Sequence, residues 1–417
     1  MRSSIARFVV PATLPVILAT ILLGALPAGQ ALAAMPGQAL SAPSPLSSQP
    51  VMYKLVNLGT GLGGASSSAA SINDFGFVSG QALVAGSSTV DHAVLWVYGF
   101  PFDLHTLGGT SSGQAFAGGL NDLGEVVGIS ETANLDPNSE PWSCGAFFAQ
   151  RQLGHACVGF RWRNGVMTAL PTLGGPNGFA AGVNNLGQAV GWAENTVRDP
   201  TCDATVPQVL QFKAVVWEPD GRTVQLPGYR GDPDQAAVAI NDKGQIVGVS
   251  GICGTAVGAL SAKHALLWDH GKVTNLGDLG GVGWNTPDAI NDNGEVVGFA
   301  NTANDVNTLA FHAFLWTRSL GRMVDLETLP GDAISEAEGI NDQGQIVGIS
   351  FGAGFSHPRA VVVFQDRVMR DLNGLVVDNP GLALTNAAAI NALGWITGSA
   401  NDQNGRQVTF LAIPVSK

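Results

Sequence analysis

Charge is scarce in this sequence, and positive charge is the scarcer kind. Only 12% of the 417 residues are charged, with 20 Lys and Arg against 32 Asp and Glu. The resulting net charge of −12 repels a phosphate backbone, and no basic cluster offsets it locally. These shortages argue against nucleic acid as a partner.

Long apolar runs are missing after the first 34 residues. Residues 1–34 begin with two arginines, continue with an apolar run from Phe8 to about Leu26, and end beside an A-x-A motif at Ala33. This order predicts a secretory signal peptide. A membrane anchor is the alternative, because the run approaches the length of a transmembrane helix although two prolines interrupt it. The A-x-A motif favours cleavage.

No second apolar run follows, so we expect no stable membrane span after cleavage. The protein is then expected to be secreted, or periplasmic or at the cell surface. Residues 35–50 are rich in Pro and Ser and predict a flexible linker, which leaves 51–417 as one domain. Removal of the leader takes away two arginines and no acid, so the net charge moves from −12 to −14.

Glycine, in contrast, is abundant at 55 residues, which suits a protein of short strands and turns. One motif occurs seven times, an Asn that is followed three residues later by Gly. The steps between successive Asn residues are 48, 63, 57, 50, 50 and 50 residues, which indicates a repeat architecture. The motifs begin at Asn73, Asn121, Asn184, Asn241, Asn291, Asn341 and Asn391.

One repeat illustrates the secondary structure expected of all. Within residues 279–329, four short strand-like stretches at 287–290, 295–300, 312–316 and 323–329 are separated by turn residues. Each unit therefore predicts four strands in an antiparallel meander. The Asn-Asp-x-Gly segment predicts a type I turn, because Asn and Asp side chains accept hydrogen bonds from the amides just ahead and Gly adopts a positive φ.

A single four-stranded unit cannot bury both of its faces, but seven units can when they pack radially. We therefore predict an all-β fold, a seven-bladed β-propeller of four-stranded antiparallel blades. The last repeat stops after its third strand at 408–415, and 52–59 matches a fourth strand. The N-terminal strand is expected to close the ring. An open solenoid such as a β-helix is the alternative. A solenoid gives no reason why the last repeat lacks a fourth strand and the N-terminal residues match one.

The pattern A-x-x-I-N-D-x-G-x-V-V-G, then H-A-F-L-W, then D-L-x-x-L-G-G resembles the HAF family of extracellular repeats. The resemblance covers residues 52–417, with His-Ala-Phe at 312–314 and near-copies at 92–94 and 264–266. The other four repeats depart from the pattern at the His. The resemblance implies an exported bacterial protein of propeller type, and it implies no established reaction.

The repeats contain residue types that bind metals or react, but their placement favours structural roles. His92, His264 and His312 occupy the same place in separate blades and are not expected to converge on one ion. Each turn offers one carboxylate and one amide, too few for calcium. Two G-x-S-x-G strings, around Ser111 and Ser350, lack the strand-to-helix turn of a nucleophile elbow. We therefore expect no metal, no cofactor and no catalytic residue here.

Loop insertions break the period in repeats two and three. The segment from the second-strand Gly to the end of the third strand has 34 residues in repeat two and 26 in repeat three, against 16 in repeat one. All four cysteines fall in the loops of repeats two to four, which suits an oxidising compartment, and their spacing matches no zinc pattern. Of the three pairings that four cysteines permit, we predict Cys144–Cys157 within one insertion and Cys202–Cys253 between neighbouring blades.

The loops after the second and fourth strands share one face of a propeller, which we call the loop face. We expect a monomeric, non-catalytic binding module for an extracellular protein or glycan, with its ligand on this face. The alternative is a carbohydrate-active enzyme, a polysaccharide lyase or glycoside hydrolase, with two carboxylates about 5–10 Å apart across the channel mouth. The candidate ligand-binding residues are Trp142, Arg151, Arg198, Asp232, Asp234, Trp284, Asp305 and His357, with His155, Asp199 and Arg359 beside them.

Overall fold

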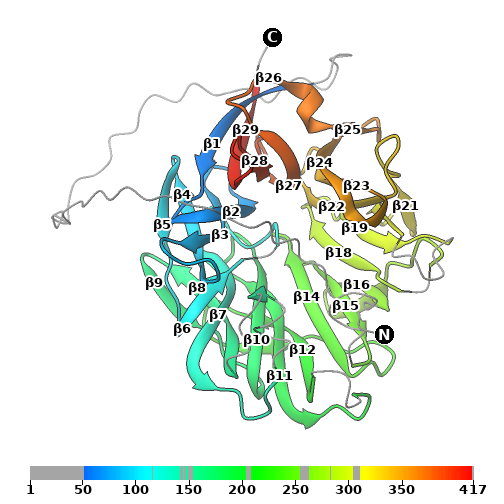
Figure 1. Cartoon of the computed structure of the whole chain (residues 1–417). Coiled ribbons are helices and arrows are strands. Elements are labelled where there is room, and N and C mark those ends of the chain that lie inside the picture. The colour runs from blue at the N-terminus through cyan, green and yellow to red at the C-terminus, as the bar shows by residue number, and fades with distance from the viewer. Residues whose placement is uncertain are drawn as a thin grey trace.

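The chain forms a ring of seven antiparallel β-sheets, the predicted β-propeller (Figure 1). The computed structural model describes residues 51–114, 116–140, 144, 147–148, 154–202, 208–253, 263–281, 283–303 and 310–415. The predicted leader and linker lie outside these ranges. In the ranges described, no helix is long and apolar enough to cross a membrane.

Blades 1 to 6 are meanders whose strands follow chain order outward from the central channel, and blade 7 differs in its outer strands. The innermost strands are β2 (Gly63–Ile72), β6 (Gly108–Gly113), β10 (Gly174–Val183), β14 (Asp234–Ile240), β18 (Thr286–Ile290), β22 (Ile334–Ile340) and β27 (Ala383–Ile390). The second strands are β3 (Val78–Val84), β7 (Val126–Leu135), β11 (Ala189–Arg198), β15 (Ile246–Gly251), β19 (Val296–Asn301), β23 (Ile346–Gly352) and β28 (Ile396–Asn401).

The third strands carry most of the buried aromatic residues, and the fourth strands form the rim. The third strands are β4 (Asp91–Val97), β8 (His155–Arg163), β12 (Leu210–Trp217), β16 (His264–Asp269), β20 (Phe311–Trp316), β24 (Ser356–Val363) and β29 (Gln407–Val415). The fourth strands of blades 1 to 6 are β5 (Phe100–Asp103), β9 (Val166–Ala169), β13 (Thr223–Gln225), β17 (Lys272–Asn275), β21 (Met323–Asp325) and β25 (Met369–Asp371).

The fourth strand of blade 5 is shorter than predicted. In blade 5 the strand ends at Asp325 and does not continue to residue 329, because the Asp325 carboxylate accepts a hydrogen bond from the backbone N–H of Glu327 (2.6 Å). Glu327 has a φ of +60°, which turns the chain out of the sheet toward the next blade.

The N-terminal strand closes the ring, as predicted. Strand β1 (Met52–Gly59) pairs antiparallel with β29 and supplies the fourth strand of blade 7. It buries Tyr53 and Leu55 in the core of that blade. The sequence did not predict β26 (Val376–Asp378), which follows the 3₁₀ helix η2 (Leu372–Leu375) and pairs in parallel with β1 as a fifth strand. An ion pair between Lys54 and Asp378 (3.1 Å) holds this edge.

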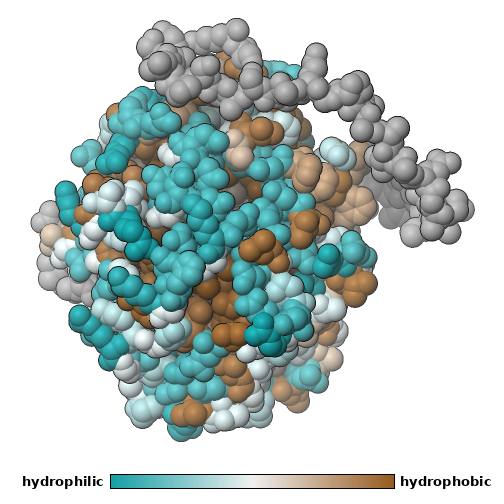
Figure 2. Space-filling model, turned by 180° about the vertical axis from the view of Figure 1, so that it is seen from behind, coloured by the Kyte–Doolittle hydropathy of each residue, from teal (hydrophilic) through white to brown (hydrophobic). Residues whose placement is uncertain are grey.

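The hydrophobic core lies between blades. One cluster joins Val247 and Leu267 of blade 4 to Phe314 and Trp316 of blade 5, so each blade completes its burial against the next one. The third-strand Trp residues fill these spaces as predicted, and the Trp217 indole donates to the carbonyl of Pro171 (2.8 Å). On the outside, hydrophilic residues cover most of the face that Figure 2 shows, with hydrophobic patches between them.

Candidate functional site

The seven motif asparagines form a closed ring of hydrogen bonds around one mouth of the channel. Within each turn the Asn Oδ1 accepts from the amides two and four residues ahead, as Asn73 does from Phe75 (3.1 Å) and Phe77 (2.9 Å). Each Asn Nδ2 also donates to the backbone carbonyl of the motif Asn in the next blade, over 2.9–3.2 Å. The predicted turn is confirmed, and the bond between blades is an additional role.

The glycine of each motif has the predicted conformation. Its φ lies between +72° and +77° in all seven turns, a region that other residues enter only with strain. This conformation lets the chain re-enter the sheet after the turn. The repeat motif therefore has two structural roles: it forms the turn within a blade, and its Asn forms the hydrogen bond to the next blade.

A second ring lies beside the first, at the position after each Asn. The backbone N–H of each member donates to the side-chain oxygen of its counterpart in the next blade, over 2.8–2.9 Å. The ring is open between Asp342 and Ala392, because Ala392 has no side-chain acceptor. Its members are Asp74, Asp122, Asn185, Asp242, Asp292, Asp342 and Ala392.

Five carboxylates thus share one mouth of the channel. Burial, followed by repulsion from neighbouring ring carboxylates, raises the pKa of Asp74 and of Asp292, against the hydrogen bonds that each accepts. Asn185 relieves part of this repulsion, since its Nδ2 donates to Asp122 (3.2 Å) and to Asp242 (3.0 Å). This mouth, which we call the turn-face mouth, attracts cations.

Four carboxyl groups lie on the innermost strands, and three of them come from the neighbouring blades 5 and 6, whereas the fourth is Asp234 at the start of β14. Six of the seven innermost strands have a β-bulge three residues before the motif Asn. The bulge residue is Ala or Val in four of them, but it is Asp288 in blade 5 and Glu338 in blade 6. Glu336 precedes Glu338 by two residues on β22. We call Asp288, Glu336 and Glu338 the channel acids.

The channel acids have few of the described partners that would stabilise their charged forms. Asp288 is 7% exposed and its Oδ2 has no hydrogen-bond partner, whereas Glu338 accepts one bond from the Nδ2 of Asn386 in blade 7 (3.0 Å). None of the ion pairs in the described ranges includes any of the three. Glu336 and Glu338 keep partial exposure, which on an innermost strand is exposure to the channel.

This environment changes how the channel acids titrate. Burial, with added repulsion from Glu338, raises the pKa of Glu336 to about 8, and burial raises the pKa of Glu338 to about 7. Burial, followed by repulsion from both glutamates, also raises the pKa of Asp288. Near neutral pH the group therefore holds protons that a bound cation would displace. The sequence analysis did not predict the channel acids, because two short strands of different repeats supply them. The available signal was the presence of acidic residues in innermost strands that otherwise consist mostly of small residues.

The two described acids predicted for the loop face have structural partners. Asp232 accepts hydrogen bonds from Ser250 Oγ (2.6 Å) and His264 Nδ1 (2.8 Å). Asp234 is fully buried and accepts from the backbone N–H of Phe212 (3.0 Å). Burial, together with neighbouring Asp199, raises the pKa of Asp234 to about 8. Asp234 thus joins blade 4 to blade 3, whereas Asp232 holds two strands of blade 4.

The other predicted ligand-binding residues come from separate blades. Trp284 is half-buried and packs edge-on against Phe311, with ring centroids 4.7 Å apart. Arg198 at the end of β11 and His357 in β24 are exposed. Beside His357, Arg359 forms an ion pair with Asp332 (2.8 Å). Trp142, Arg151 and Asp305 lie outside the described residues.

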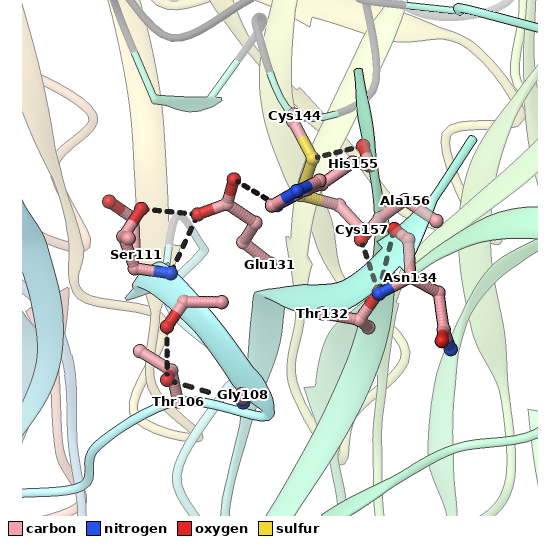
Figure 3. Close-up of polar contacts among 12 residues, drawn as sticks. Thr106, Gly108, Ser111, Glu131, Thr132, Asn134, Cys144, His155, Ala156 and Cys157 are labelled. Carbon is pink, nitrogen blue, oxygen red and sulfur yellow. Dashed lines mark hydrogen bonds and ion pairs between the residues drawn. A yellow bond between two sulfur atoms is a disulfide. The ribbon is translucent and has the colours of Figure 1, made fainter. Parts of the chain in front are cut away.

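Both predicted disulfides are present. Cys144–Cys157 ties down the blade 2 insertion, and Cys202–Cys253 joins the loops of blades 3 and 4. Figure 3 shows Glu131 near the Cys144–Cys157 disulfide. The Glu131 carboxylate lies 3.1 Å from His155 Nδ1 and forms a hydrogen bond with it. The same carboxylate accepts from the backbone N–H of Thr110 (2.7 Å).

The described residues of the blade 2 insertion contact the core and the neighbouring blade. Phe148 is buried against Phe179 and Phe212. Glu140 accepts hydrogen bonds from the backbone N–H groups of Val209 and Leu210 in blade 3 (2.6 and 2.8 Å). Removal of the insertion would therefore disturb two blades.

The histidines of the HAF-like stretches form ion pairs with aspartates near the rim. His92 pairs with Asp103 (2.9 Å), and His312 pairs with Asp325 in the same way (2.9 Å). The equivalent His264 pairs with Asp232, which comes from the loop before β14. In blades 1 and 5 this His thus ties the third strand to the end of the fourth strand, whereas in blade 4 it ties the third strand to the loop that enters the blade.

The two serines of the G-x-S-x-G strings are buried. Ser111 lies within β6, and Ser350 lies within β23 and donates to Asp332 (2.6 Å). Neither occupies an exposed strand-to-helix turn, so the strings do not form a nucleophile elbow.

Comparison with known proteins shows similarity at the level of the fold alone. No family model matches the chain, and no curated protein matches it either. The fold is similar to a streptogramin B lyase structure (TM-score 0.48, 10% identity, 86% of this chain and 97% of that one) and to virginiamycin B lyase from Staphylococcus aureus (TM-score 0.48, 9% identity, 87% and 99%). It is also similar to Pyrococcus horikoshii acylaminoacyl peptidase (TM-score 0.43, 9% identity, 87% of this chain and 54% of that one).

Proposed function

We propose that this protein is an extracytoplasmic binding module that takes a positively charged organic group into its channel. The observation that carries the proposal is Asp288, a buried carboxyl with an unpartnered oxygen beside Glu336 and Glu338. A buried acid without a partner is costly in the free protein. A ligand that brings a positive charge would supply the missing partner.

An organic cation fits the channel acids better than a metal ion does. One metal ion needs its ligand atoms close together, and the channel acids are not among the described groups that place three ligand atoms within 4.8 Å of one another. An alkylammonium or guanidinium group spans a larger distance and donates several hydrogen bonds in different directions. The acidic turn-face mouth would draw such a ligand toward the channel.

Two features support the proposed extracytoplasmic location. The leader-like N-terminus and the two disulfides suit an oxidising compartment, where rigid propellers can present binding sites. The loop face over blades 2 to 4 is a second place where an extracellular protein or glycan could attach, because its loops are held in place before any ligand arrives.

The test is calorimetric titration of the mature protein with agmatine and putrescine, and with uncharged 1,4-butanediol as the control ligand. We expect the two cations to bind and the diol not to bind. Asp288→Asn and Glu336→Gln should each weaken binding by about tenfold, since each removes a charge-assisted contact. Glu327→Gln, on the rim of blade 5, is the matched control and should bind as the parent does.

Equal binding by the parent and the two channel variants would reject the channel as the site. The alternative function, a carbohydrate-active enzyme, is supported by the neighbouring carboxyl groups of blades 5 and 6, because general acid and base pairs are built from such groups. Turnover of a polysaccharide that Glu336→Gln abolishes would favour that alternative.

A further inference from the structure

We propose that blade 1 binds one zinc ion through His92, Asp103 and His105. His92 Nδ1 lies 2.9 and 3.0 Å from the two carboxylate oxygens of Asp103, and His105 Nδ1 lies 3.4 Å from Asp103 Oδ2. Ligand atoms from all three side chains lie within 4.8 Å of one another. Tetrahedral ligands at about 2.0–2.2 Å from zinc are about 3.3–3.6 Å apart, so small side-chain adjustments would let one ion contact all three.

The ion pair between the third-strand His and the Asp that ends the fourth strand recurs in another blade, whereas the third ligand, His105, is found in blade 1 alone. Blade 5 has the same pair, His312 with Asp325, but Glu327 stands where blade 1 has His105. Among its described residues, blade 5 does not bring three ligand atoms together. We expected no metal from the sequence, because His92 and its counterparts in other blades cannot share an ion, and His105 did not enter that reasoning.

The backbone holds these ligands ready for an ion. Asp103 ends β5, and its Oδ1 accepts a hydrogen bond from the backbone N–H of His105 (2.7 Å). His105 has a φ of +63°, while Leu104 between the two ligands is buried and anchors the turn. His92 is fixed within β4. The His105 side chain is the most exposed of the three ligands, so it is the one that a bound ion would restrain most.

The donor set favours zinc over hard cations. Imidazole nitrogens with one carboxylate suit zinc and neighbouring transition metals, whereas calcium and magnesium prefer oxygen ligands alone. Three protein ligands leave a fourth position, which a water molecule would fill because the His105 side chain is 78% exposed. The only other described group of this kind contains Cys202 and Cys253, whose sulfur atoms are joined in a disulfide.

Tag-free protein, treated with EDTA and then dialysed, should be titrated with zinc chloride by calorimetry. We expect one ion per chain, and at least about 100-fold weaker binding in His105→Asn, which loses one of three ligands. His312→Asn is the matched control, because it removes the same kind of His from a blade without the third ligand, and it should bind zinc as the parent does.

Two further readouts keep the result clear. Cobalt(II) bound at the site should give a tetrahedral visible spectrum that His105→Asn lacks. Thermal melts should show that His105→Asn folds normally, since the side chain is exposed. Absence of zinc binding in the parent, or equal loss in His105→Asn and His312→Asn, would overturn the proposal.

Discussion

Asn391 in the last blade donates its side-chain amide to the backbone carbonyl of Asn73 in the first blade, at 3.0 Å and 318 residues apart in the chain. This bond is the closing link of the asparagine ring. The seventh blade is thus joined to the first at the centre by side chains, and at the rim by strand β1, which sits in the sheet of blade 7.

Substitution of Asn391 by Ala should destabilise the whole propeller. The change removes the bond to Asn73 and the two bonds that Asn391 Oδ1 accepts from the amides of Leu393 and Trp395. Buried groups left without partners cost about 1–3 kcal/mol. Denaturant unfolding measures this loss, and Asn404→Ala at an exposed turn is the control. Equal midpoints for both variants would contradict the role of the ring.

Closure by β1 predicts an alternating effect along that strand. Leu55→Ala should cost about 2–5 kcal/mol because Leu55 is buried in the blade 7 core. The neighbouring Val56→Ala should cost less than about 1 kcal/mol because Val56 points to solvent. Deletion of residues 51–58 should abolish the cooperative unfolding transition or cause aggregation, since it opens a strand edge. A deletion variant that melts like the parent would refute closure.

The two disulfides should contribute unequally to stability. Their sequence separations are 13 and 51 residues, for which the chain-entropy estimate is about 3 and about 4 kcal/mol. Replacement of Cys202 and Cys253 by Ser should therefore lower the melting temperature more than replacement of Cys144 and Cys157. Thiol titration of the unfolded, oxidised parent should find no free thiol. The reverse ranking would show that local strain outweighs chain entropy.

The channel acids predict a loss of stability as pH rises. Glu336 and Glu338 have pKa values of about 8 and about 7, above the ordinary 4.5, so the folded protein holds more protons than the unfolded chain between pH 4.5 and 8. The free energy of unfolding therefore falls as pH rises through this window. Glu336→Gln should be more stable than the parent at pH 8 and gain little at pH 4.5. An unchanged pH profile in thermal melts would contradict this assignment.

Export predicts a shortened N-terminus. Cleavage after Ala33 or Ala34 is expected from the small residues that follow the apolar run. Mass spectrometry of the protein recovered from its native compartment determines the first residue. An intact Met1 on a membrane-bound protein would show that the run is an anchor.

The repeat period, the turn chemistry and the strand exchange at the chain ends determine the fold, and all three can be read from the sequence. Each depends on local features: Asn and Gly at fixed spacing make the turn, and a missing fourth strand requires a supplied one. The disulfide pairing was also predictable from the place of the cysteines in the repeats, although Cys157, expected in a loop, lies in strand β8. The extra strand β26 could not be predicted from the sequence. Its three residues carry no strand pattern, and they form a strand only because β1 offers an edge for pairing.

Only the tertiary structure decided which side chains meet across blades. Asp288 and Glu336 lie in different repeats, and their proximity follows from radial packing of two innermost strands, which no local pattern encodes. The same holds for Phe148, a residue of the blade 2 insertion that packing between blades places in the core. His92 and His105 are brought together by a hairpin and a turn at the rim. A repeat specifies contacts inside its own blade, whereas these sites arise where one blade faces another or where the chain leaves the regular pattern.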